Sequence, residues 1–64
     1  MKNLIDLYKE QRDEYSAKLL KNIEDFSMAD TQEEMMIIAK KGAGFKLMLE
    51  HAENEIDKLE KANP

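Results

Sequence analysis

Histidine is a common metal ligand and acid–base catalyst, and this chain contains one, His51. Glu55 lies four residues later, on the same face of a helix, so the two side chains could hold a metal. Helical di-metal sites, however, place a glutamate three residues before each histidine, and that position here is Met48. We therefore expect no metal site and no cofactor, and we expect His51 to be a surface residue.

Hydroxyl groups are the other candidates for chemistry, and they belong to Tyr8, Tyr15, Ser16, Ser27 and Thr31. No histidine or lysine stands at a spacing that indicates activation of any of them. The stretch Gly42-Ala43-Gly44 is followed by Lys46, but it lacks the longer glycine framework and the preceding strand of a phosphate-binding loop. The sequence predicts no catalytic residue, no small-molecule substrate and no enzymatic activity.

Composition excludes two further classes of function. Fourteen acidic and ten basic residues give a net charge of −4 at pH 7, and no basic face accumulates, so we expect no direct binding to nucleic acid. The charged fraction is 38%, and the longest apolar run covers only 35–39, so we expect no membrane span. Without a signal-like apolar stretch or any cysteine, a cytoplasmic protein is the expectation.

The elements that carry these side chains are predicted by a seven-residue apolar repeat in the second half of the chain. It comprises Met35, Ile38, Gly42, Phe45, Leu49, Ala52, Ile56 and Leu59. Steps of three and four residues keep one stripe facing a partner along a helix, which predicts a helix over about 31–61. The stretch 40–44 also resembles a helix C-terminus, so three helices are an alternative, although the repeat passes Gly42 without a change of phase.

A first helix is predicted over about 3–26, with an apolar stripe at Met1, Ile5, Tyr8, Tyr15, Leu19, Ile23 and Phe26. The pattern falters over 27–30, which we interpret as a turn. Asp30 or Thr31 is the expected N-cap of the second helix, because acidic residues follow directly in its first turn. The fold class is therefore all-α, an antiparallel helical hairpin.

A turn centred near residues 28 and 29 predicts which residues meet across the hairpin. Tyr15 would lie over Gly42, and Arg12 would lie near Phe45. The second helix is longer than the first, so we expect it to overhang at its free end. Ile56 and Leu59 would then lack neighbours within the chain.

Self-association is the expected way to cover the remaining apolar surface. A chain of about 60 residues buries only roughly 60% of its unfolded surface, and the second helix is apolar on more than one face. The expectation is a homodimer forming a four-helix bundle, with a different protein as the competing partner. The predicted oligomer or partner interface comprises Met35, Ile38, Gly42, Phe45, Leu49, Ala52, Ile56, Leu59, Met36 and Met48.

The run from Ala39 to Ile56, in which glycines precede an aromatic–leucine segment and an acidic tail, resembles the second helix of very short helical-hairpin proteins of bacteriophages. This resemblance implies a viral protein in the host cytoplasm, either an inhibitor or regulator of a host protein or a small scaffolding subunit of a larger assembly. In the scaffold alternative, Ile56 and Leu59 dock on another chain. A third possibility is that the acidic segment 50–60 occupies a basic groove by mimicking nucleic acid.

Overall fold

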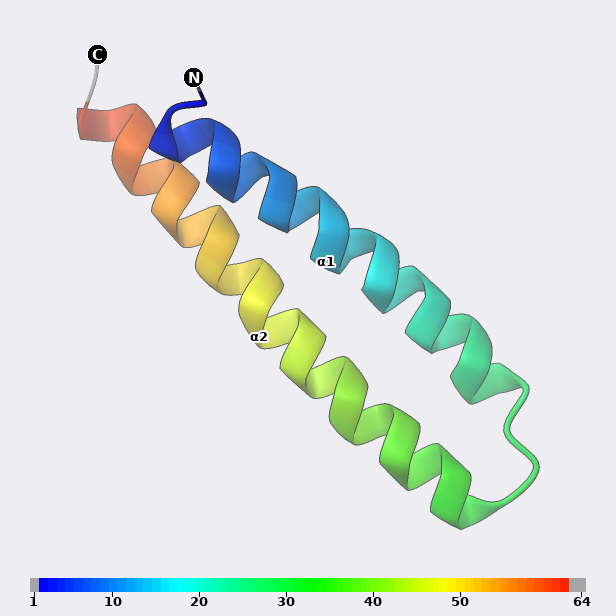
Figure 1. Cartoon of the computed structure of the whole chain (residues 1–64). Helices are drawn as coiled ribbons and strands as arrows, with labels where there is room; N and C mark the ends of the chain where they lie inside the picture. Colours follow the sequence, from blue (N-terminus) through cyan, green and yellow to red (C-terminus); the bar gives the residue numbers. More distant parts are fainter. Residues whose placement is uncertain (1, 63–64) are drawn as a thin grey trace.

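The computed structural model describes residues 2–62, and over this range the chain is an all-α helical hairpin without strands. Helix α1 spans Leu4–Ser27 and helix α2 spans Gln32–Ala62. The two helices run antiparallel and lie side by side, with both ends of the chain at the same end of the hairpin (Figure 1). Both helices begin and end one residue later than predicted.

Each helix begins at a side-chain cap. The Asn3 side chain accepts a hydrogen bond from the Asp6 backbone N–H at 2.9 Å. Thr31 Oγ1 accepts from the Glu34 backbone N–H at 3.1 Å, and Glu34 Oε2 accepts from the Asp30 backbone N–H at 3.0 Å. Thr31 is therefore the N-cap of the two residues predicted, and Glu34 reaches back one residue beyond it, a variant of the capping box.

Helix α2 continues without interruption through both of its glycines, so the three-helix alternative is wrong. Neither glycine has a positive φ, which a helix end in a left-handed turn would require. The two glycines differ in their surroundings. A Cβ built on Gly42 would lie 2.4 Å from Asn22 Oδ1, whereas one built on Gly44 would meet nothing within 4 Å. A close neighbour therefore requires glycine at position 42 but not at position 44.

The helices pack through the predicted stripe of α2, which we call the seam. All eight of its residues are buried or half-buried in the structure. The buried hydrophobic residues over 2–62 are Ala52, with 0% of its surface exposed, and Ile56, with 7% exposed. Both lie in the half of the hairpin nearer the chain ends, which we call the terminal half. The core of this chain is therefore small and confined to one end.

The helices meet in a different alignment from the one predicted. Asn22 lies over Gly42, and Tyr15 contacts Phe45 with 6.3 Å between ring centroids. The predictions of Tyr15 over Gly42 and of Arg12 near Phe45 are both wrong, and Arg12 instead pairs with Asp13 at 3.1 Å. The residue facing Gly42 is seven positions later than expected, which is one full repeat of the pattern.

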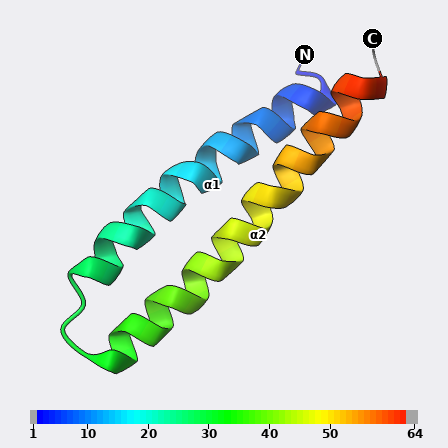
Figure 2. The ribbon, with the colours of Figure 1, turned by 180° about the vertical axis from the view of Figure 1, so that it is seen from behind.

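This alignment also covers the end of α2. The extra length of α2 extends past α1 at both ends of the hairpin, rather than at the free end alone (Figures 1 and 2). Continuing from the Asn22–Gly42 level in steps of seven residues brings Tyr8 level with Ile56. The prediction that Ile56 and Leu59 lack intrachain neighbours is therefore wrong, since Ile56 is buried and Leu59 half-buried.

The apolar stripe of α1 needs one further correction. Ile23 was predicted to face α2 but is 60% exposed, and the half-buried Asn22 takes its place. Of the other stripe residues, Ile5, Tyr8, Tyr15 and Leu19 are half-buried. Phe26 is 43% exposed, and Met1 lies outside the described residues. Ile23 thus becomes part of the outer surface.

Candidate interaction surfaces

The predicted interface residues fall into two groups. The eight seam residues lie between α1 and α2, where they hold the hairpin together. Met36 and Met48 remain on the surface, with 61% and 41% of their area exposed. Surface available to a partner therefore comes mainly from residues beside the seam.

Two broad faces flank the seam, and residues on each recur at steps of three and four. In an antiparallel pair, corresponding flanking positions of both helices share one face. The Lys9–Glu60 ion pair, at 4.0 Å, crosses the seam on the first of these faces. Steps of seven residues from Lys9 and Glu60 lead to Ile23 and Ala39, which therefore lie on the same face. We call this the patch face, and the other the groove face.

The patch face is uncharged and largely apolar in the half nearer the turn. Leu20 is 65% exposed, Ile23 60% and Met36 61%, and the alanines between them on α2 are also exposed. We call this surface the turn-half patch, and it consists of Leu20, Ile23, Met36, Ala39 and Ala43. Ser16 and Ser27 continue it on α1 and Gln32 continues it on α2, without adding a charge. In a chain whose charged fraction is 38%, such an exposed surface is typical of a candidate site of association.

The terminal half of the same face is entirely charged. Its residues are Asp6, Lys9, Asp13, Lys46, Glu50, Glu53, Asp57 and Glu60. Six carboxylates against two ammonium groups give this half-face a formal charge of −4, equal to the net charge of the whole chain. Charge and apolar surface are thus separated along one face.

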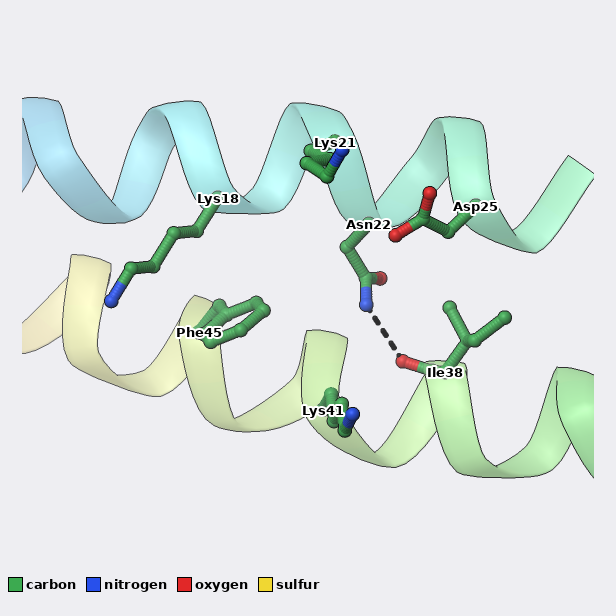
Figure 3. A pocket seen from close by; sticks show the side chains of 7 residues that line it. All are labelled: Lys18, Lys21, Asn22, Asp25, Ile38, Lys41 and Phe45. Carbon is green, nitrogen blue, oxygen red and sulfur yellow. Dashed lines mark hydrogen bonds between the residues drawn. The ribbon is translucent and has the colours of Figure 1, made fainter.

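The groove face contains a shallow depression of about 270 Å³ between the helices (Figure 3). It is lined by Lys18, Lys21, Asn22, Asp25, Ile38, Lys41 and Phe45. Lys18 reaches from α1 across to the Phe45 ring of α2, as Figure 3 shows. Its Nζ lies 5.0 Å from the centroid of Tyr15 and 5.9 Å from that of Phe45, which is cation–π geometry.

The depression is basic on balance, with three lysines and one aspartate in its lining. Lys18 also pairs with Glu14 at 3.2 Å, while within residues 2–62 neither Lys21 nor Lys41 has a carboxylate within 4.0 Å. These ammonium groups stand at the mouth of an open depression, where water solvates them. The depression therefore presents exposed positive charge without a built anion site.

A polar contact crosses the seam at the base of this depression. Asn22 Nδ2 donates a hydrogen bond of 2.8 Å to the Ile38 backbone carbonyl, drawn as a dashed line in Figure 3. The Asn22 carboxamide reaches this carbonyl because Gly42 has no side chain to block it. A single polar residue in a helix–helix seam fixes how the two helices align, since other alignments leave it unpaired.

Three of the residues considered for chemistry, His51, Tyr8 and Tyr15, make aromatic contacts. His51 is exposed, as predicted, and its ring meets Tyr8 edge-on with centroids 6.1 Å apart. Over residues 2–62, no three histidine, cysteine or acidic side chains come together as a metal site would need. Neither helix in that range has the combination of length and apolarity required to cross a bilayer.

Sequence reasoning missed Asn22 and the turn-half patch for the same reason. Stepping strictly by three and four from Tyr15 through Leu19 leads to Asn22, whereas preferring apolar residues leads to Ile23. Strict periodicity was therefore the available signal. Following it would have assigned Ile23 to the surface and placed it beside Leu20.

Comparison with protein-family models, with curated proteins and with solved structures found no match to this chain. The resemblance of Ala39–Ile56 to phage hairpin proteins therefore stays a prediction. The function has to be argued from the surface of the hairpin itself.

Proposed function

We propose that this chain is a non-enzymatic protein–protein interaction module that acts by packing exposed helix faces against other helices. One observation carries the proposal. Ten large hydrophobic residues of the described chain are at least 41% exposed, while only Ala52 and Ile56 are buried hydrophobic residues. Monomeric proteins rarely leave contiguous apolar surface open to water, and such patches commonly bind other proteins.

The role of the module follows from such binding. In the leading form, the chain inhibits or regulates a protein of the cell in which it is made. The scaffold alternative was motivated by Ile56 and Leu59 docking on another chain. Ile56 is covered by α1 and only 7% exposed, so that motivation no longer applies.

Affinity capture from the cell that makes the protein tests the proposal. The bait is the tagged hairpin, and the control is a variant with Ile23, Ile37 and Leu47 changed to glutamate. These three side chains are 60%, 56% and 66% exposed, so the control should keep its fold. Circular dichroism verifies that the helix content of the two baits agrees.

The expected result is a protein that the unmodified hairpin captures and the control does not. The purified protein is then titrated with the hairpin. A saturable change in its activity supports the regulatory form. Identical captured proteins with both baits, together with a hairpin that stays monomeric, would contradict the proposed function.

A further inference from the structure

The turn-half patch has a size and shape suited to a symmetric partner. Its large side chains, Leu20 and Ile23, line α1, while Ala39 and Ala43 line α2 and leave that helix backbone accessible. We propose that the occupant of this patch is a second copy of the chain, and that two hairpins pair through their turn halves in an antiparallel, staggered dimer. This inference rests on the proposed function, because self-association is one case of packing exposed helix faces.

Area supports a second copy as the occupant. The hairpin measures 49 × 19 × 13 Å between Cα atoms, so half of its broad face covers roughly 450 Å². Two such faces in a symmetric pair bury about 900 Å², close to the ~1,000 Å² that a specific interface requires. The pair therefore lies at the lower size limit, which predicts a reversible dimer in the micromolar range.

Charge decides the relative direction of the two hairpins. If both turns lay at the same end, the two terminal half-faces, each with a formal charge of −4, would oppose one another. If the hairpins were antiparallel and fully overlapped, each apolar patch would cover the charged half of its neighbour and strip water from its carboxylates. Antiparallel pairing of the turn halves alone avoids both penalties.

In this arrangement the twofold axis crosses the patch between Ile23 and Leu20, so Leu20 of each copy meets Ile23 of the other. The alanines of one α2 face those of the other, which allows the helices to approach closely. The charged terminal halves then project from opposite ends of the dimer into solvent. Only uncharged surface becomes buried.

A matched pair of isoleucines tests the location of the interface. Ile23 lies in the patch and is 60% exposed, while Ile37 lies on the groove face in the same half of the hairpin and is 56% exposed. Sedimentation equilibrium over roughly 5–500 μM compares the unmodified chain with Ile23→Glu and Ile37→Glu. We expect Ile23→Glu to weaken dimerisation at least tenfold and Ile37→Glu to change it less than threefold.

A second pair of variants separates loss of dimerisation from loss of folding. Leu20→Glu, in the patch, is compared with Leu4→Glu, on the groove face, at starting exposures of 65% and 55%. Circular dichroism confirms the helix content of every variant. An unmodified chain that is monomeric throughout the concentration range overturns the inference. So does a dimer that Ile23→Glu and Leu20→Glu leave intact, or one that Ile37→Glu dissociates equally.

Spin labelling tests the direction of pairing, which the absence of cysteine makes simple. A single nitroxide is attached at Glu53→Cys, twelve residues beyond the centre of the patch on α2. At 1.5 Å per residue, the staggered antiparallel dimer separates the two labels by about 36 Å along its axis. Pulsed dipolar spectroscopy giving a distance near this value supports the arrangement, and a distance below about 20 Å overturns it in favour of parallel pairing.

The inference and the proposed function fail in different ways. A chain that is monomeric in sedimentation but captures a specific cellular protein rejects the second copy and keeps the function. A chain that neither dimerises nor captures a protein rejects both.

Discussion

The two halves of this hairpin share the same pair of helices but distribute their apolar residues differently. The terminal half contains Ala52 and Ile56, the buried hydrophobic residues of the described chain, under a charged patch face, while Leu4, Leu7 and Met48 are exposed on its groove face. In the turn half Asn22 of α1 packs on Gly42 of the seam, while Leu20, Ile23 and Met36 face solvent. On the patch face, one half is therefore charged above the buried core, and the other leaves apolar side chains exposed to solvent.

Under the proposed function, this difference separates folding from binding within a very small protein. A chain of this size buries too little surface to place all of its apolar residues in its own core. Gathering the buried ones at one end lets the patch face of that end be charged, while the patch face of the other end is uncharged. The acidic terminal surface then limits which alignments with a partner are acceptable.

The largest predicted effect comes from placing the same charge in each half. Ile56→Asp should abolish the cooperative fold, because it buries an unpaired carboxylate at a side chain with 7% exposure and costs about 4 kcal/mol or more. Ile23→Asp, at 60% exposure, should lower the free energy of unfolding of the monomer by less than about 1 kcal/mol. Urea titration followed by circular dichroism at low protein concentration measures both. Equal losses of stability would show that the two halves do not differ in this way.

The sequence predicted what is local to each helix. The seven-residue repeat, which passes Gly42 without a change of phase, and the cap candidates Asp30 and Thr31 after the break in the pattern were sufficient to predict both helices and the hairpin. These features depend on residues within one or two turns of one another. The stripe of α2 is the seam of the structure for the same reason.

Alignment between the helices could not be predicted in this way. A repeating pattern looks the same after a slip of seven residues, so Tyr15 and Asn22 were equally consistent partners for Gly42. The choice depends on one long-range contact, from the Asn22 amide to the Ile38 carbonyl. The spacing of apolar residues cannot predict this hydrogen bond, because both of its partners are polar groups. The coverage of Ile56 follows from this alignment, whereas the exposure of Ile23 follows from the phase of α1 alone.

The second prediction compares the two glycines at the border of the turn half. Gly44→Ala should raise the free energy of unfolding by about 1 kcal/mol, because alanine favours the helix and its Cβ meets no neighbour. At Gly42 the same gain is offset, since the new Cβ displaces Asn22 and breaks a hydrogen bond worth about 1 kcal/mol. Urea denaturation of the two variants should therefore differ by about 1 kcal/mol.

A double-mutant cycle isolates the cause of that difference. In an Asn22→Ala background the displaced amide is absent, so Gly42→Ala should become as stabilising as Gly44→Ala. If Gly42→Ala stayed neutral in this background, Asn22 would not be the reason for glycine at position 42.

The third prediction compares the caps at the two ends of the hairpin. Thr31→Ala removes the side-chain oxygen that accepts from the Glu34 N–H, and with it the local geometry in which Glu34 accepts from the Asp30 N–H. The free energy of unfolding should fall by about 1 kcal/mol. Asn3→Ala removes a single contact to Asp6, beside a helix end with little packed around it, and should cost about 0.5 kcal/mol. Thermal melts of the two variants measure the order of these losses, and a larger loss at Asn3 would contradict it.

The smallest predicted effect belongs to the ion pair that joins the helices in the terminal half. Lys9 Nζ and Glu60 Oε1 lie 4.0 Å apart, and their side chains are 44% and 56% exposed. Water and salt screen such a pair, so Glu60→Gln should change the free energy of unfolding by less than about 0.5 kcal/mol. The measurement is urea denaturation at low salt and again at 0.5 M NaCl, with Glu53→Gln on the same face as control. A loss of about 1 kcal/mol or more for Glu60→Gln alone, at both salt concentrations, would contradict this prediction. The charged surface would then stabilise the helix pair together with the buried Ala52 and Ile56.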